Sequence, residues 1–232
     1  MTKKFILIIF FTFLMQFSHC QIIDRYGFSL GASYSTQFWN INLPTIGMID
    51  WDFDLDYKFG FMAFLSVEKS LGMFALRSEF GYIQKGFCDT QELTFIDGGS
   101  ISSVSPKNKN VILHDLALNI GLKVTPFKFE NPPYIFVGVR SDYLISYKDI
   151  VFVEPVSELE FGKYKSTIDD FTKLNFGGLL GVGIDIKEMF YLEVEYNPNF
   201  TKSIKSINNK GLSIKDNCFG VKLGININKL IK

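Results

Sequence analysis

The fold of this chain is decided by residues 76–87, which read LRSEFGYIQKGF. Two kinds of side chain alternate in this stretch: Leu76 and Phe80 fall on one face, and Arg77 and Glu79 fall on the other. Successive side chains of a β-strand point to opposite faces of a sheet. The alternation therefore predicts a strand with one apolar face and one charged face.

The same alternation with period two recurs along the chain and predicts eight strands. Most of these segments reach the roughly 9–11 residues that a tilted strand needs to cross a membrane. The expected strands are 26–36, 57–67, 73–87, 111–124, 134–146, 172–186, 190–201 and 216–228.

The segments that connect these strands alternate strictly between long and short. Antiparallel neighbours need only tight turns, so folding alone does not require every second connection to be long. An outer-membrane barrel has this asymmetry, with short turns on the periplasmic side and longer loops outside. We expect both termini on the periplasmic side and irregular, polar loops outside. The long segments are 37–56, 88–110, 147–171 and 202–215, and the short ones are 68–72, 125–133 and 187–189.

The chemistry of the two faces predicts which one points inward. Alternation by itself also fits a soluble, lipocalin-like barrel, which is a membrane barrel turned inside out. One face is aromatic and aliphatic with hardly a charge, whereas the other mixes many glycines with charged residues. Glycine offers nothing to pack on a solvent-facing sheet, but it suits the crowded interior of a narrow barrel. We therefore expect these charged residues in the lumen: Lys58, Arg77, Glu79, Lys85, Asp115, Lys123, Arg140, Asp142, Asp185, Glu193, Glu195 and Lys222.

This placement has a consequence for transport through the barrel. Eight strands leave an interior only just wide enough for its own side chains. Charges confined there must be paired or hydrogen-bonded. The sequence thus predicts a lumen that is plugged by ion pairs, with a narrow channel for small solutes as the alternative.

The first twenty residues have the features of a secretory signal peptide. Lys3 and Lys4 precede the apolar run 5–17, and a short segment with small side chains follows. A run of this length is too short for a membrane helix, which needs roughly 20 residues. We predict that residues 1–20 are cleaved and that residues 21–232 form one barrel domain.

The composition supports an exported protein without a nucleic-acid partner. Lys and Arg total 24 residues, and Asp and Glu also total 24, so there is no basic excess. After the signal peptide no apolar stretch is long enough for a helical membrane span. Lipid attachment at Cys20 is the alternative to simple cleavage, although Phe17 and His19 differ from the small residues that lipoprotein signals carry.

The sequence contains few of the residues, such as His and Cys, that catalysis or a metal site would use. A lipid acyltransferase would need a His with a Ser and an acid near the outer rim. His114 lies near that rim, but its parity points it toward lipid or the interface, whereas the parity of Asp115 points it into the lumen. We predict no enzyme, no cofactor and no metal. The alternatives are a lipid-modifying enzyme and Ca²⁺ binding by the aspartates at every second position of 50–56.

Cysteines and loop aromatics allow only limited predictions. Cys88 and Cys218 belong to strands that are not neighbours, so we expect both to remain thiols. The long loops contain aromatic residues that would form either a binding surface or an interfacial belt. These are Trp39, Trp51, Phe87, Phe95 and Phe152.

Residues 76–87 also carry a family resemblance. They are similar to the Leu-Arg-x-Glu-Leu-x-Tyr-x-x-Lys-Gly signature of PorT-like outer-membrane β-barrel proteins of Bacteroidota. Segments 176–184 and 191–197 resemble later strands of that family. The chain departs from the family at Glu195, where Arg is common, and at Ala117, where Pro is frequent. The resemblance implies an outer-membrane location and an accessory role in protein secretion.

The sequence therefore predicts an all-β protein, an eight-stranded, antiparallel, up-and-down transmembrane β-barrel of the outer membrane. We expect a structural or interaction role. The expected partners are outer-membrane lipid, the barrel-assembly machinery, and secretion-system or surface proteins that contact the long loops. A soluble periplasmic ligand-binding barrel is the first alternative.

Overall fold

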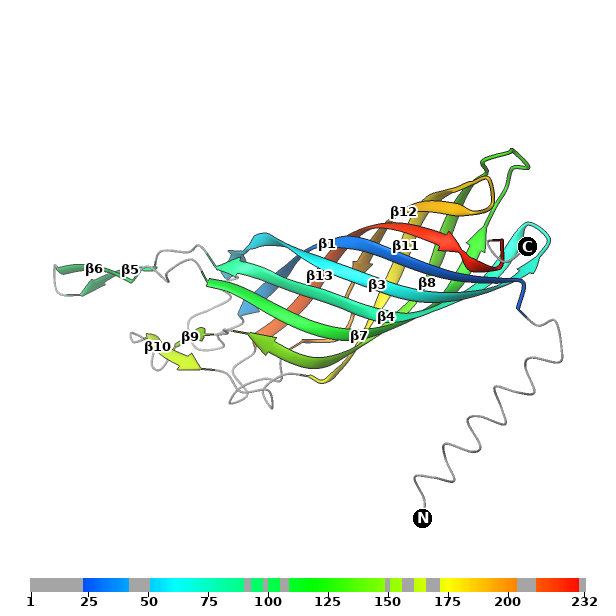
Figure 1. Cartoon of the computed structure of the whole chain (residues 1–232). Coiled ribbons are helices and arrows are strands. Elements are labelled where there is room, and N and C mark those ends of the chain that lie inside the picture. The colour runs from blue at the N-terminus through cyan, green and yellow to red at the C-terminus, as the bar shows by residue number, and fades with distance from the viewer. Residues whose placement is uncertain are drawn as a thin grey trace, which may run out of the picture.

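The chain folds into a barrel of long strands in a computed structural model (Figure 1). The structure describes residues 23–41, 51–89, 93–97, 100–104, 109–148, 151–155, 161–165, 172–203 and 212–229. The strands are β1 (Arg25–Ile41), β2 (Trp51–Asp54), β3 (Asp56–Leu71), β4 (Phe74–Asp89), β5 (Leu93–Asp97), β6 (Ser100–Val104), β7 (Lys109–Val124), β8 (Pro133–Lys148), β9 (Val151–Pro155), β10 (Phe161–Lys165), β11 (Leu174–Ile186), β12 (Phe190–Pro198) and β13 (Leu212–Asn226), and the helical turn η3 (Ile227–Lys229) follows.

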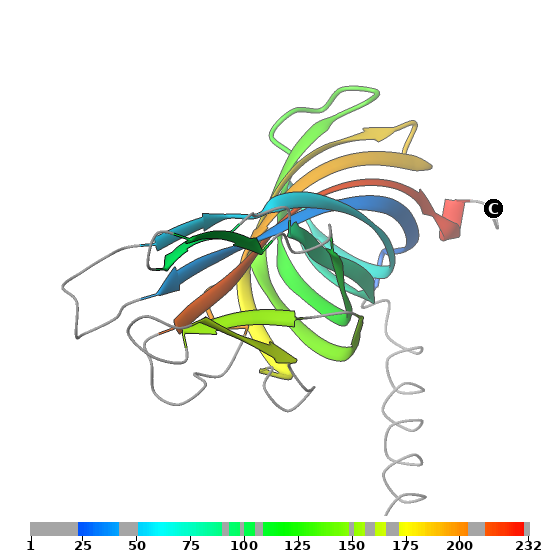
Figure 2. The same cartoon turned by 90° about the vertical axis from the view of Figure 1, so that its left-hand side faces the viewer.

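Eight of these strands form the closed wall of the barrel. They pair antiparallel in the order β1-β3-β4-β7-β8-β11-β12-β13, and β13 pairs with β1 along the full register from Gly27–Asn226 to Ile41–Leu212. The short strand β2 continues the line of β3 beside β1. Figure 2 shows the wall from its loop side. The prediction of an eight-stranded antiparallel barrel is confirmed.

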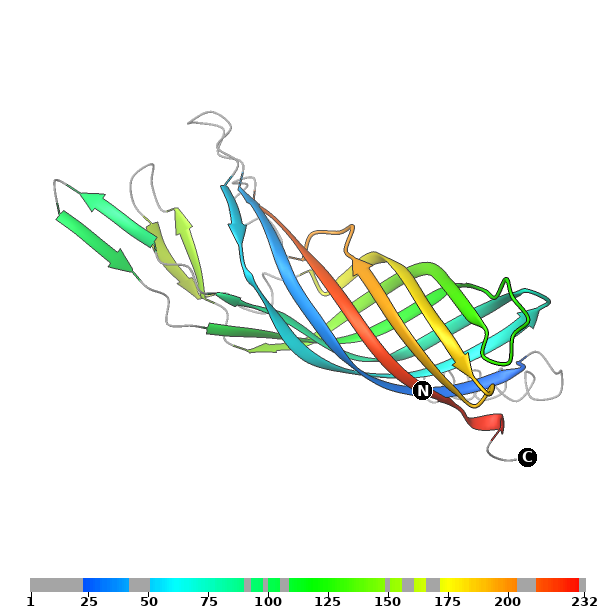
Figure 3. The ribbon, with the colours of Figure 1, turned by 90° about the horizontal axis from the view of Figure 1, so that it is seen from above.

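The two ends of the barrel differ. Short connections join β3 to β4, β7 to β8 and β11 to β12 at one end, which we call the turn end. The hairpins β5–β6 and β9–β10 lie beyond the opposite end, the loop end (Figures 1 and 3). The expectation that the long loops are irregular was wrong for these segments. Their sequences, such as LTFID and VFVEP, contain the β-branched and aromatic residues that favour strands.

Several strand boundaries differ from those expected; β1 continues to Ile41 and β13 begins at Leu212. Strand β3 continues to Leu71, so the turn consists of Gly72 and Met73 and not of 68–72. Strand β12 ends at Pro198 and does not reach residue 201. After Pro198 the chain bends toward β11, where the backbone N–H of Phe200 donates to the carbonyl of Phe176 at 2.8 Å.

The wall separates an apolar exterior from a polar interior. The outward positions carry large exposed hydrophobic side chains, for example Phe59 at 73% and Leu223 at 58%. The buried residues instead include many charged and amide side chains. The interior also has apolar patches that the sequence reading did not foresee, formed by Met62, Phe64, Ile83, Ala117 and Cys218 and by Tyr134, Phe136 and Leu179. In the described part of the chain, no helix is both long and apolar enough to cross a membrane.

Side chains of β1 form hydrogen bonds with backbone groups at a bulge between β3 and β4. The ladder between these strands is interrupted from the pair Tyr57–Phe87 to the pair Met62–Ile83. Ser35 Oγ accepts from Gly86 N at 2.8 Å and donates to Gly86 O at 2.9 Å. Gly86 has a φ of 152°, a conformation that strongly favours glycine.

Because Gly60 of β3 has no side chain, Ser33 of β1 can reach across β3 to the backbone of β4. A Cβ at Gly60 would lie 2.3 Å from Gln84 O and 2.5 Å from Ser33 Oγ. The Ser33 hydroxyl donates to that same carbonyl. Because β3 lacks a side chain at this point, the polar groups freed by the bulge find partners on β1, as buried backbone groups require.

We expect Ser35→Ala to destabilise the barrel by roughly 1–3 kcal/mol, the usual cost of leaving a buried backbone group without a partner. Ser29→Ala is the matched control, because Ser29 is equally buried and its Oγ has no hydrogen-bond partner in the described chain. Urea unfolding in phospholipid vesicles measures both. Equal unfolding midpoints for the two variants would contradict the bridging role of Ser35.

The tight turn between β11 and β12 contains two strained residues. Lys187 and Glu188 have φ of 49° and 57°, and Met189 N donates to Ile186 O at 3.1 Å, as in a type I′ turn. Asn-Gly is the preferred pair for this turn. We expect Lys187→Asn with Glu188→Gly to stabilise the barrel by roughly 1 kcal/mol in urea unfolding. Lys128→Asn, in a connection without a positive φ, should leave the midpoint unchanged.

Candidate functional site

The candidate site is the charged column inside the barrel, and its centre is Lys222. The Lys222 Nζ lies 2.9 Å from Glu79, 2.8 Å from Glu193 and 2.6 Å from Glu195. The contact with Glu79 is a hydrogen bond, and the contacts with Glu193 and Glu195 are ion pairs. Arg77 completes this central cluster by pairing with Glu79 and, at 2.7 Å, with Glu193.

Aromatic rings enclose the two central cations. The guanidinium carbon of Arg77 lies 5.1 Å from the ring centre of Phe136 and 4.9 Å from that of Tyr191. The Lys222 Nζ lies 5.3 Å from the ring centre of Phe64. These distances fall within the range of cation–π contacts, which add to the ion pairs when the cation is desolvated.

The loop-end cluster lies between this centre and the loop end. Lys85 bridges Asp115 at 3.0 Å and Asp142 at 2.7 Å. Arg140 donates through Nε to Asp142 at 2.6 Å and reaches Glu195 of the central cluster at 3.9 Å. The four members of the cluster, Lys85, Asp115, Arg140 and Asp142, come from β4, β7 and β8.

The turn-end cluster lies on the opposite side of the centre. Lys123 lies 2.8 Å from Asp185 and 3.6 Å from Glu68, and Arg25 reaches the same two carboxylates at 3.1 and 3.7 Å. Tyr134 links this cluster to the centre. Its hydroxyl donates to Glu193 at 2.8 Å, and its ring lies 4.1 Å from the Lys123 Nζ. The three clusters therefore form one continuous column.

Eleven of the twelve residues expected in the lumen are buried and lie within these clusters. Lys58 is the exception. It is half-buried beside Gly86, and no ion pair of Lys58 occurs within the described ranges.

The sequence reading missed several members of the column. Glu68 was assigned to a turn, and Arg25 was placed before the first strand, although both have the parity of the lumenal residues. Asp216 is the first residue of the expected strand 216–228, whereas β13 begins at Leu212, so the sequence does not identify it as lumenal. It is buried and accepts from Gln37 at 2.6 Å and from Ser203 at 2.8 Å.

His114 lies outside the column, on the outward side of β7. Its Nδ1 lies 2.5 Å from the Tyr82 hydroxyl, while its neighbour Asp115 is buried and paired with Lys85. The two side chains thus point to opposite faces of the wall, as their parity predicted. A catalytic arrangement would need the acid on the histidine, which this geometry does not provide.

The described residues contain one group of side chains whose geometry would suit a metal ion. The carboxylates of Glu79, Glu193 and Glu195 offer ligand atoms within 4.8 Å of one another. The Lys222 ammonium already lies among these three carboxylates, so their cation is a side chain of the protein itself. Asp50, in the alternating aspartate run, lies outside the described residues, as do the side chains of Asp52 and Asp54.

The remaining loop predictions have mixed outcomes. Phe87 is 2% exposed and cannot belong to a loop binding surface, because its parity turns it into the lumen. The side chains of Trp39, Trp51, Phe95 and Phe152, like residues 1–20, lie outside the described part. Cys88 and Cys218 are not joined by a disulfide.

The fold and the column together define the class of protein: a closed, eight-stranded antiparallel barrel of the outer-membrane type, with an apolar exterior and an ion-paired interior. No family model and no curated protein matches the sequence. The similarity to PorT-like proteins therefore stays a prediction.

Solved structures with a similar fold exist. The outer membrane protein OprG from Pseudomonas aeruginosa matches with a TM-score of 0.48 at 10% identity, over 88% of this chain and 95% of that chain. Neisserial surface protein A matches with a TM-score of 0.39 at 9% identity, over 86% and 96%. Ail of Yersinia pestis, in complex with the heparin analogue sucrose octasulfate, matches with a TM-score of 0.37 at 10% identity, over 87% and 99%.

Proposed function

We propose that this protein is an integral outer-membrane barrel whose lumen is sealed and whose function is structural or interaction-based, exerted through the hairpins and loops at its loop end. The observation that carries the proposal is the continuous ion-paired column. Its central members Glu79, Glu193 and Lys222 are completely buried. Moving an ion through this column would require breaking several buried pairs at once, each at a cost of a few kcal/mol.

Membrane insertion is supported by the outer surface. A soluble lipocalin-like barrel would bury its apolar face and expose its charges, whereas here Arg140 is 1% exposed and Leu65 is 60% exposed. Lipid would cover the exposed belt, and a closed barrel satisfies every backbone group of the wall without water. The soluble alternative is therefore not favoured.

The proposal assigns no catalytic role. The one histidine of the barrel wall contacts Tyr82, and the acid beside it in the sequence belongs to the lumen. An accessory role in protein secretion is the finer part of the proposal, and its support is the resemblance of residues 76–87 to PorT-like proteins. Candidate partners are envelope or secretion proteins that contact the loop end.

We expect no unitary current from the protein in planar bilayers, because an eight-stranded barrel has an interior only just wide enough for its own side chains, and here ion-paired side chains occupy it. Flotation with vesicles and a heat-dependent shift in gel mobility provide the control that folded protein is inserted. Stable current steps from such protein would overturn the sealed lumen and favour a narrow channel. Failure to float would overturn membrane insertion.

The interaction role is tested by exchanging the β5–β6 hairpin, residues 93–104, for a short Gly-Ser linker. We expect the barrel to remain inserted, because this hairpin forms a sheet separate from the wall. Proteins cross-linked to the intact chain in native membranes should be lost from this variant. An unchanged cross-linking pattern in this variant and in one lacking 151–165 would contradict a role for the hairpins.

A further inference from the structure

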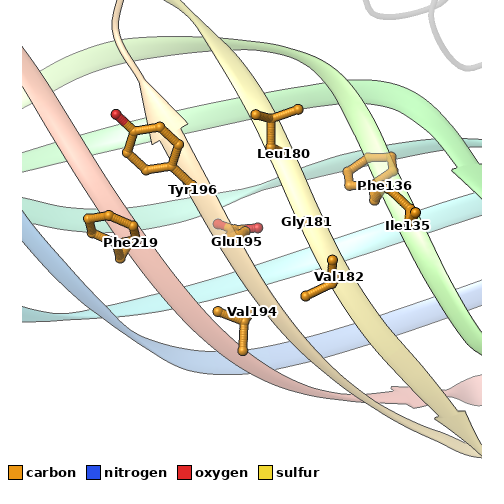
Figure 4. Close-up of a pocket in the computed structure, with 9 residues that line it drawn as sticks. All are labelled: Ile135, Phe136, Leu180, Gly181, Val182, Val194, Glu195, Tyr196 and Phe219. Atoms are coloured by element: carbon orange, nitrogen blue, oxygen red, sulfur yellow. The ribbon is translucent and has the colours of Figure 1, made fainter.

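The outer wall contains a groove over β8, β11, β12 and β13 (Figure 4). Its volume is about 270 Å³, close to the lower end of small-molecule pockets. Almost all of its surface is apolar. The residues that line it are Ile135, Phe136, Leu180, Gly181, Val182, Val194, Glu195, Tyr196 and Phe219.

The floor of the groove includes Gly181, a residue with the parity of the lumenal side chains. Gly181 lies at the middle of the groove in Figure 4, and a Cβ there would be 3.5 Å from its nearest atom, Val194 O. The lumenal glycines of more crowded strands differ, since a Cβ at Gly31 would lie 2.1 Å from Val221 O. A Cβ at Gly181 would also lie 3.6 Å from Phe136 Cβ and 3.7 Å from Glu193 Cδ, so the missing side chain leaves space on the lumenal side. The depression on the outer surface lies between the outward side chains of Leu180, Val182, Val194 and Tyr196.

The groove opens to the exterior and not to the lumen. On the inner side, the Glu195 carboxylate pairs with Lys222 at 2.6 Å and accepts from Asn197 at 3.1 Å, so its charge faces the column. Phe136 is fully buried behind the wall and contacts Arg77. A ligand can therefore enter only from the medium that surrounds the apolar belt.

An aromatic pair lies at the loop-end side of the groove. The rings of Tyr196 and Phe219 are stacked with their centres 4.8 Å apart. Tyrosine is enriched where lipid headgroups meet the hydrocarbon of a membrane. Toward the turn end the lining is aliphatic, with Val182 and Val194, whereas Leu180 is level with Tyr196 in the strand register.

We propose that this groove binds one acyl chain of a membrane lipid, with the headgroup at the Tyr196 end and the chain lying along Val182 and Val194. The inference rests on the proposed membrane insertion. Three features favour a hydrocarbon chain: the lining is apolar, the opening faces the lipid belt, and the aromatic pair stands at one end only.

The experiment counts phospholipids retained by the full-length barrel. The protein is extracted into detergent from vesicles of dioleoyl phosphatidylglycerol, and native mass spectrometry measures the lipid-bound fraction. We expect one retained lipid per wild-type barrel. Val182→Trp and Val194→Phe fill the groove, and each should reduce the bound fraction at least tenfold.

Leu65→Trp is the matched control, because Leu65 is outward and 60% exposed, compared with 59% for Val182, but belongs to β3 outside the groove. It should retain the lipid. The inference is overturned if wild type retains none, if both groove variants retain it, or if Leu65→Trp loses it equally. Vesicle flotation separates the two proposals: protein that floats but retains no lipid refutes the groove alone, whereas protein that does not float refutes membrane insertion.

Discussion

Lys222→Met should destabilise the barrel by about 3–5 kcal/mol, because Glu79 and Glu193 are then left with Arg77 alone and Glu195 with Arg140 at 3.9 Å. Methionine keeps much of the volume of the side chain, so the loss is that of the charge. Denaturant unfolding in phospholipid vesicles measures the free energy. The effect should exceed that of any replacement of a single lysine at the surface of the protein.

Lys69→Met is the matched control for this substitution. Lys69 pairs with Asp24 at 3.1 Å, and about a third of each side chain is exposed. Surface pairs of this kind contribute roughly 0–1 kcal/mol. Adding Glu195→Gln to Lys222→Met should recover part of the stability, because one uncompensated charge is removed. A Lys222→Met barrel as stable as the Lys69→Met barrel would show that the central cluster does not support the fold.

Leu118→Arg should cost about 2–4 kcal/mol, the penalty for an arginine on the lipid face near the middle of a membrane barrel. Leu118 is outward on β7 and 40% exposed, so no cavity or clash contributes. The same unfolding assay in vesicles measures the change. In a soluble barrel an exposed arginine would cost almost nothing, and the assay therefore tests which medium surrounds the wall.

Phe129→Arg provides the comparison at the membrane edge. Phe129 is 65% exposed in the turn-end connection between β7 and β8. Near the interface the penalty falls to roughly 0–1 kcal/mol. Equal costs at Leu118 and Phe129 would contradict the depth dependence that an inserted barrel requires.

Residues 76–87 show how much of this could be predicted. The period of two placed Leu76 and Phe80 outward and Arg77, Glu79 and Lys85 inward, and the structure has all five on those sides. Strand ends were less predictable. Glu68 was missed because its strand runs past the expected turn, and the hairpins β5–β6 and β9–β10 were missed because short strands carry few periods of alternation.

Alternation is a local property, so it specifies the strands and which residues share a face, and the chemistry of the two faces indicates which one points inward. It cannot specify which charges meet. Arg77 and Glu193 are 116 residues apart in the chain, and Lys222 and Glu79 are 143 apart, yet each pair is in contact across the lumen. Those contacts depend on the curvature of the wall and on strand register. The bulge at Gly86, the serines that repair it and the groove at Gly181 likewise exist only once neighbouring strands are aligned.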